Sequence, residues 1–121
     1  MSSSFVDFEV YKKSVQLTKN IFLLLNDPVF LKESAFSSQL KRAVLSITNN
    51  IAEGSEYNSN NQFIRYLKIA KGSCAEVRNM LILANELGFK NIDELKVMIN
   101  LSIEISQQLS NFINYLDRNR S

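Results

Sequence analysis

The sequence contains no histidine and no tryptophan, and only one cysteine, one proline and three glycines among its 121 residues. Without histidine, the chain lacks the usual acid–base group at neutral pH and the commonest metal ligand. The single cysteine, Cys74, excludes an internal disulfide bond. Gly72 and Gly88 stand alone, so no Gly-rich phosphate loop is present. We therefore predict no metal, no cofactor and no catalytic residue.

The shortage of glycine and proline also argues against an all-β fold, since the many turns of such a fold use these residues. Apolar residues make up 45% of the chain and charged residues 21%, which is typical of a globular chain. The length predicts one domain over residues 1–121. No apolar run is long enough to cross a membrane, and the N-terminus lacks a signal pattern. We therefore expect a cytoplasmic protein.

Apolar residues spaced by three and four predict four helices, at about 6–26, 37–53, 59–87 and 92–117. Asn26-Asp27-Pro28 ends the first helix, because proline cannot continue it, and residues 29–35 form a loop or a short turn of helix. Long helices, short connections and heptad spacing together predict an all-α, antiparallel up-down four-helix bundle.

Each predicted helix has an apolar face. The first face comprises Phe8, Tyr11, Val15, Thr18, Phe22 and Leu25, widened by Val10, Leu17, Ile21 and Leu24. The second comprises Leu40, Val44, Ile47 and Ile51. The third comprises Phe63, Leu67, Ala70, Cys74, Val77, Leu81, Ala84 and Gly88. The fourth comprises Leu95, Met98, Ser102, Ile105, Leu109, Phe112 and Leu116.

Polar residues and glycines at the helix ends predict caps. Gly54 is a natural left-handed cap for the second helix, and Gly88 ends the third. Capping boxes are expected where Ser59 precedes Gln62 and where Asn91 precedes Glu94.

Three features of the middle helices are candidates for function. Cys74 lies on an apolar face, where a thiol normally packs as a small hydrophobe. Glu53 and Glu76 are the acidic residues closest to apolar faces, and they form either a paired-carboxylate acid–base site or separate structural contacts. We favour the structural contacts, because two carboxylates without metal or histidine are a weak signal. Small residues around Gly72 would let another helix approach closely, either within the subunit or between subunits.

Charge placement is more informative than the net charge of +2. Between residues 41 and 72, five basic residues meet two acidic ones, whereas nine basic residues meet ten acidic ones elsewhere. The five basic residues are Lys41, Arg42, Arg65, Lys68 and Lys71. They form either a phosphate-binding surface or an ordinary solvated face, and a ring of subunits would strengthen the first interpretation by repeating the patch.

Two segments carry a resemblance to a known family. SQLKRAVLSITNNIAEGS, followed by QFIRYLKIAKGSCAEVRNMLILANELGF, resembles the small bacterial four-helix-bundle proteins encoded in intervening sequences of 23S rRNA genes, often labelled ribosomal proteins. The accessory protein of diversity-generating retroelements is similar too. The most specific positions are Asn50-Ile51-Ala52-Glu53-Gly54, and Gly72-Ser73 with Ala75-Glu76. Thr48 and Asn49 replace the family's usual Pro-Ser, and the chain is less basic than the retroelement members.

The resemblance implies a non-enzymatic bundle that assembles into a ring-like homo-oligomer, expected to be a homopentamer. The retroelement members bind nucleic acid and a reverse transcriptase through a basic ring surface. The motif residues are implied to serve packing and subunit contacts rather than catalysis: Arg42, Asn50, Glu53, Gly54, Arg65, Gly72, Ser73 and Glu76. Two hypotheses follow, an oligomer that binds RNA or DNA through its basic residues and an interaction module that docks a protein partner.

Overall fold

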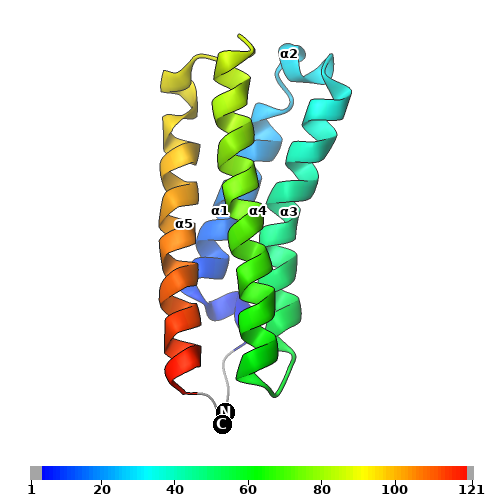
Figure 1. Ribbon diagram of the computed structural model, residues 1–121. Coiled ribbons are helices and arrows are strands. Elements are labelled where there is room, and N and C mark those ends of the chain that lie inside the picture. Colours follow the sequence, from blue (N-terminus) through cyan, green and yellow to red (C-terminus); the bar gives the residue numbers. More distant parts are fainter. Residues whose placement is uncertain (1–3, 120–121) are drawn as a thin grey trace.

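The structure is a computed structural model that describes residues 4–119, and its regular elements in that range are all helices. In chain order they are η1 (Phe5–Asp7), α1 (Glu9–Leu24), α2 (Pro28–Leu31), α3 (Ser34–Ser55), α4 (Asn60–Glu86) and α5 (Ile92–Arg118). Figure 1 shows α3, α4 and α5 side by side, with α1 behind them. The predicted all-α class is confirmed. No helix in residues 4–119 combines the length and apolar character that a membrane crossing requires.

The helix bounds differ from the predicted ones mainly at the N-terminal ends. A short 3-10 turn, η1, precedes α1, so α1 begins at Glu9 rather than near residue 6. Asp27 accepts a hydrogen bond from the Val29 N–H at 3.2 Å, and Pro28 then starts the single turn α2. Proline fits this position because its missing N–H would have no partner in a first turn. α3 runs without a break through Thr48 and Asn49.

The prediction that Gly54 is a left-handed helix cap is wrong. Gly88 is the only glycine with a positive φ in residues 4–119, and α3 continues through Gly54 to Ser55. A Cβ placed on Gly54 would lie 2.7 Å from Tyr66 Cβ and 2.9 Å from Phe63 Cδ1. A glycine is needed here because α3 and α4 approach more closely than a side chain would permit.

Gly88 does end α4, as predicted. Its φ is +78°, and its N–H donates to the Asn85 carbonyl at 3.0 Å. The Phe89 N–H donates to the Ala84 carbonyl at 2.8 Å, which completes a Schellman motif. Phe89 then packs edge-on against Phe30, with ring centroids 6.0 Å apart.

The other caps form at the predicted residues. Ser59 Oγ accepts a hydrogen bond from the Gln62 N–H at 3.3 Å. Asn91 Oδ1 accepts from the Asp93 N–H at 2.8 Å, one residue earlier than the predicted capping box with Glu94 would place it. Both side chains satisfy an N–H that the first turn of a helix leaves without an intrahelical partner.

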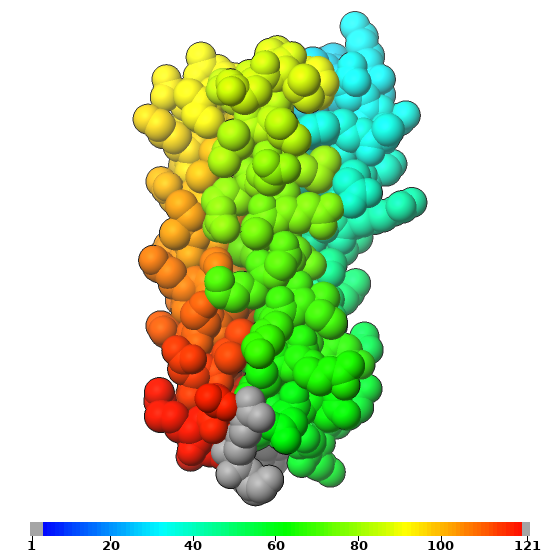
Figure 2. Space-filling model, in the orientation of Figure 1, coloured from blue at the N-terminus to red at the C-terminus, as the bar shows by residue number. Residues whose placement is uncertain are grey.

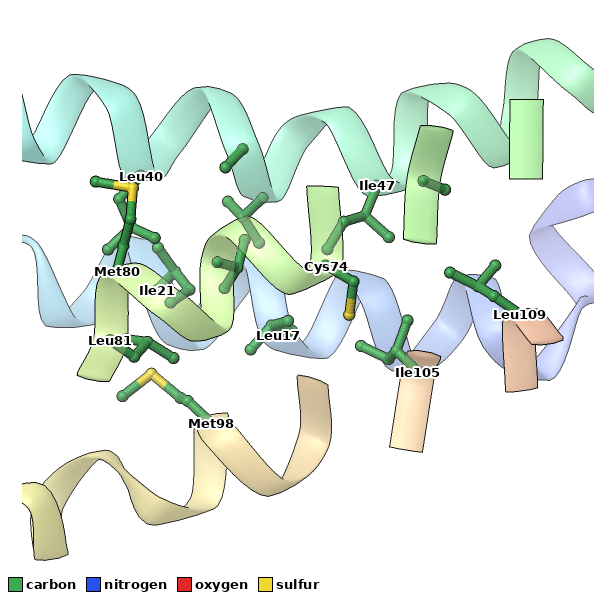
Figure 3. Close-up of a cluster of buried hydrophobic side chains, with 14 of the residues drawn as sticks. Leu17, Ile21, Leu40, Ile47, Cys74, Met80, Leu81, Met98, Ile105 and Leu109 are labelled. Atoms are coloured by element: carbon green, nitrogen blue, oxygen red, sulfur yellow. The ribbon is translucent and has the colours of Figure 1, made fainter. Parts of the chain in front are cut away.

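A core of apolar side chains runs along the bundle (Figure 3). The predicted face of α3 is fully buried, as is that of α4 apart from Gly88 at its end. The predicted face of α5 is also buried, except that Phe112 is partly exposed and packs against the core. The heptad spacing therefore identified the inner faces of these three helices correctly.

For α1 the predicted face is displaced. The apolar side chains that it buries most deeply are Leu17 and Ile21, which were predicted only to widen the face. Tyr11 and Val15 are half-buried, and Phe22 is 38% exposed. Both rows of α1 are apolar, so their spacing alone does not decide which row turns toward α3 and α5.

An ion pair joins the α1–α2 turn to the α4–α5 connection. Lys90 Nζ lies 2.6 Å from Asp27 Oδ2 and 3.7 Å from Glu94 Oε1. The hydrogen bond from Lys90 holds the pKa of Asp27 below its usual value and raises the pKa of Lys90. The contact links segments 63 residues apart in sequence.

The two helical glycines give opposite predictions for alanine substitution. Gly54→Ala should lower the free energy of unfolding by about 1–3 kcal/mol, because the new methyl overlaps Tyr66 and Phe63. Gly72 is exposed, and a Cβ there would meet no atom within 4 Å. Gly72→Ala should therefore raise the free energy of unfolding of the isolated subunit by about 1 kcal/mol through helix propensity. Urea unfolding at equal protein concentration measures both, and destabilisation by both changes would contradict the assignment.

Candidate nucleic-acid interface

The motif residues of α3 and α4 lie mostly along the contact between these two helices. Asn50 Nδ2 donates to the Ser46 carbonyl at 2.8 Å and to Ser46 Oγ at 2.9 Å, and Ser73 Oγ donates to the same Ser46 Oγ at 2.8 Å. Ser46 thus connects Asn50 to Ser73, although sequence reasoning did not select it. The position of Ser46, one helical turn before Asn50, is the sequence feature that could have identified it.

Glu76 and Glu53 occupy separate places along this contact. Gln39 Nε2 of α3 donates to Glu76 Oε2 at 2.6 Å. The Glu53 carboxylate instead interacts with the Tyr66 hydroxyl. Tyr66 lies ten residues before Glu76, which is about 15 Å along α4. The two carboxylates do not form an acid–base pair. Among residues 4–119, no cluster of acidic, cysteine or histidine side chains could hold a metal ion.

Glu53 belongs to a small polar cluster beside Gly54. The hydroxyl oxygens of Tyr57 and Tyr66 are 3.1 Å apart, and the two rings stack with centroids 5.3 Å apart. The hydrogen bond with Tyr57, partial burial and the nearby Glu53 carboxylate raise the pKa of Tyr66 to about 12. Tyr66 therefore stays protonated at neutral pH and can donate a hydrogen bond. The cluster holds the C-terminal end of α3 against α4.

Gly72 is the exception among the motif residues. Its exposure and the open space around it exclude a close helix contact within the subunit. Ala75, one turn further along α4, is exposed as well. The within-subunit explanation for these small residues is therefore wrong for this pair.

Cys74 is a buried core residue, in line with its predicted structural role (Figure 3). Its Sγ donates to the Ser102 carbonyl of α5 at 2.9 Å. Burial raises the pKa of the thiol to about 11, although the nearby positive charges of Arg78 and Lys71 oppose that rise. At neutral pH the reactive thiolate is therefore scarce and enclosed.

The five candidate basic residues do not all face the same way. Lys41 Nζ lies 5.5 Å from the centre of the Phe22 ring, so Lys41 turns toward α1. Arg42, next to it on α3, is exposed. Gln39 and Ser46 contact α4 from a side of α3 other than the one that carries Lys41. Lys41 is therefore separated from the basic side chains of α4.

The basic residues of α4 wind from the α3 side of the helix toward α5. Arg65 Nη1 donates to Gln62 Oε1 at 3.2 Å, and both Arg65 and Lys68 are exposed. Lys71 is half-buried and lines a groove beside α5. The ion pairs within residues 4–119 involve Lys13, Lys90 and Lys96, and none involves a candidate basic residue.

Arg78 is a basic residue that sequence reasoning missed. It lines the same groove as Lys71, together with polar side chains of α5. Lys71 and Arg78 are seven residues apart, which places them on one side of α4. That spacing was the signal that could have joined Arg78 to the candidate set. Figure 2 shows the molecule from the side on which α4 lies between α3 and α5.

The fold and this surface define a class: a small all-α bundle whose motif residues mainly join two helices and whose candidate basic side chains lie on α3 and α4. Residues 6–111 match the family described as 23S rRNA-intervening sequence protein. The chain belongs to this family. No curated protein sequence matches it.

A solved structure supports the same assignment. The crystal structure of a protein of unknown function from the S23 ribosomal protein family of Bacteroides thetaiotaomicron is similar, with a TM-score of 0.78 and 29% sequence identity. The match covers 86% of this chain and 97% of that chain.

The burial of Cys74 predicts an inert thiol. In the folded protein at pH 8, Cys74 should react with a disulfide reagent at least about 100-fold more slowly than in denaturant, because both its raised pKa and its enclosure oppose attack. Absorbance of the released thiolate measures the rate. A folded-state rate equal to the denatured rate would contradict the buried position.

Proposed function

We propose that this protein is a non-enzymatic, oligomeric bundle that binds RNA. The observation that carries the proposal is the row of Arg65, Lys68 and Lys71 on α4, none of which pairs with a carboxylate within residues 4–119. Basic side chains without acidic partners can neutralise phosphates and release their counterions. The family description, which refers to intervening sequences of 23S rRNA, supports RNA as the polyanion.

The proposed architecture is an up-down antiparallel bundle. The contacts between α3 and α4 support it, because they run in opposite order along the two helices. Gln39 near the start of α3 contacts Glu76, whereas Gly54 near its end lies against Tyr66. Connections of a few residues join α3 to α4 and α4 to α5, and short connections favour antiparallel neighbours.

The proposed assembly is a ring of five subunits. An exposed apolar groove of about 340 Å³ supports self-association, and we call it the α1/α3 groove; it is lined by Tyr11, Val15, Thr18, Lys19, Phe22, Leu45 and Thr48. Exposed apolar side chains also lie on α4, where Ile69 and Ile82 are 52% and 43% exposed. Two unlike apolar surfaces on one chain suit head-to-tail contacts, which close into rings.

The same groove supports the alternative function, a module that docks another protein. An exposed apolar groove marks an interaction site without specifying the partner. A second copy of the chain is favoured because α4 itself exposes the apolar side chains Ile69 and Ile82 and the small residues Gly72 and Ala75. The two functions differ in whether RNA binds to the assembled protein.

The RNA proposal predicts a salt-dependent interaction that depends on α4. Binding of single-stranded RNA should weaken steeply with added salt, and Arg65→Glu with Lys68→Glu should abolish it at physiological ionic strength. Removing two phosphate contacts should lower the slope of log K against log salt by about 1.4. Fluorescence anisotropy over a salt series measures both quantities.

A matched double reversal on another part of the surface controls for net charge. Lys12→Glu with Lys32→Glu removes the same charge from exposed positions on α1 and just after α2, and it should leave most of the binding and the salt slope intact. Equal losses in the two variants would indicate a nonspecific charge effect. Undetectable binding by the wild-type protein at low ionic strength would contradict the RNA proposal.

The assembly proposal predicts that charges placed in either apolar surface produce monomers. Phe22→Glu in the α1/α3 groove and Ile82→Glu on α4 should each convert a pentamer into monomers, because a carboxylate is costly to bury in an apolar contact. Val97→Glu is the control, since Val97 is 71% exposed and lies outside both surfaces. Native mass spectrometry measures the stoichiometry, and a monomeric wild-type protein would contradict the ring.

A further inference from the structure

A groove between α4 and α5 is lined by two basic side chains and several polar ones. We call it the α4/α5 groove, and its volume is about 350 Å³. Its lining residues are Lys71 and Arg78 of α4 and Ile103, Ser106, Gln107, Ser110 and Asn111 of α5. A volume of this size is at the lower end for small-molecule sites.

The two positive charges of the groove have no negative counterpart in the lining. Lys71 and Arg78 are half-buried, and neither forms an ion pair within residues 4–119. Arg78 Nη1 lies 3.5 Å from Ser102 Oγ, which is long for a hydrogen bond. Partly desolvated cations attract an anion more strongly than fully solvated ones, because water screens them less.

The nearby carboxylates are engaged on other sides of their helices. Glu76 accepts its hydrogen bond from Gln39 of α3. Glu104 lies 3.5 Å from Lys13 of α1. Both acidic residues are thus directed away from the groove, which leaves its positive potential uncompensated.

The α5 wall supplies neutral groups that hydrogen-bond. Ser106 and Ser110 carry hydroxyls, and Gln107 and Asn111 carry amides. Each pair is spaced by four residues and so repeats on one side of the helix. None of the four side chains makes a hydrogen bond to another residue within 4–119, so all remain available.

Together, these side chains suit a ligand that has a phosphate group and a second part with hydrogen-bond donors and acceptors. Arginine and lysine bind phosphate oxygens, and hydroxyls add further donors. A carboxylate ligand would use the cations and leave the two amides without a role. Amides each offer a donor and an acceptor, and they recognise exposed base edges in single-stranded RNA.

We propose that the α4/α5 groove binds one nucleotide unit, with its phosphate on Lys71 and Arg78 and its base against Gln107 and Asn111. The unit comes either from a single RNA strand or from a free mononucleotide, and the strand form rests on the proposed RNA-binding function. Arg65 and Lys68, which we call the α4 ridge, would then contact neighbouring phosphates. The groove would hold one nucleotide in place.

The test compares two double variants of α4 in the full-length chain. Lys71→Gln with Arg78→Gln removes the groove charges, and Arg65→Gln with Lys68→Gln removes the same charge from the ridge. The probes are adenosine monophosphate, inorganic phosphate and a short oligoadenylate, titrated at low ionic strength by calorimetry or fluorescence anisotropy. Circular dichroism melting checks that each variant folds.

The groove proposal expects the mononucleotide to bind the wild type and the ridge variant alike, and to bind the groove variant at least about tenfold more weakly, since hydrogen bonds to a charged group are lost. Gln107→Ala with Asn111→Ala should weaken mononucleotide binding by a similar factor without changing inorganic phosphate binding. For the oligonucleotide, this amide variant should leave the salt slope unchanged, because no phosphate contact is removed.

The outcomes separate the two proposals. Mononucleotide binding without oligonucleotide binding supports the groove with a free nucleotide and overturns the RNA proposal. Oligonucleotide binding that falls equally in the groove and ridge variants, with no mononucleotide binding, supports the RNA proposal and overturns the groove. Unchanged mononucleotide binding by Gln107→Ala with Asn111→Ala would overturn the proposed base contact. The same conclusion would follow if inorganic phosphate bound the wild type as tightly as the mononucleotide does.

Discussion

The close approach of α3 to α4 is the constraint on which the other features depend. It requires glycine at position 54, because Tyr66 Cβ occupies the space that a side chain would need. The same contact carries the Ser46–Ser73 hydrogen bond and the Gln39–Glu76 hydrogen bond. With α3 fixed along one side of α4, another side of α4 faces α5, and the remainder exposes basic and apolar residues.

This packing explains why the family motifs contain few chemical groups. Most motif side chains are used to join two helices, and a helical contact uses small and hydrogen-bonding residues rather than acids and bases. Gly72 departs from this pattern because open space surrounds it. A glycine in an exposed helix costs stability, so a contact outside the subunit would account for its presence. In the proposed ring, a contact between subunits would place Gly72 against a neighbouring chain.

The surface of α4 divides the proposed roles along its length. Arg65 and Lys68 lie nearer its start, and the exposed Ile82 lies nearer its end. Lys71 stands where the basic row reaches the α4/α5 groove. In the proposed function, one helix supplies charges for phosphates and apolar side chains for another subunit, and it also forms one wall of the α4/α5 groove.

The sequence by itself determined the all-α class, the inner faces of α3, α4 and α5 and the end of α4 at Gly88, because these follow from periodicity and local backbone preference. It did not decide the role of Gly54, since a helix cap and a close helix contact both favour glycine. It also left open which apolar row of α1 is buried, and that Lys41 turns toward α1 rather than toward the basic side chains of α4. These depend on how each helix is rotated about its axis, which only packing against its neighbours sets.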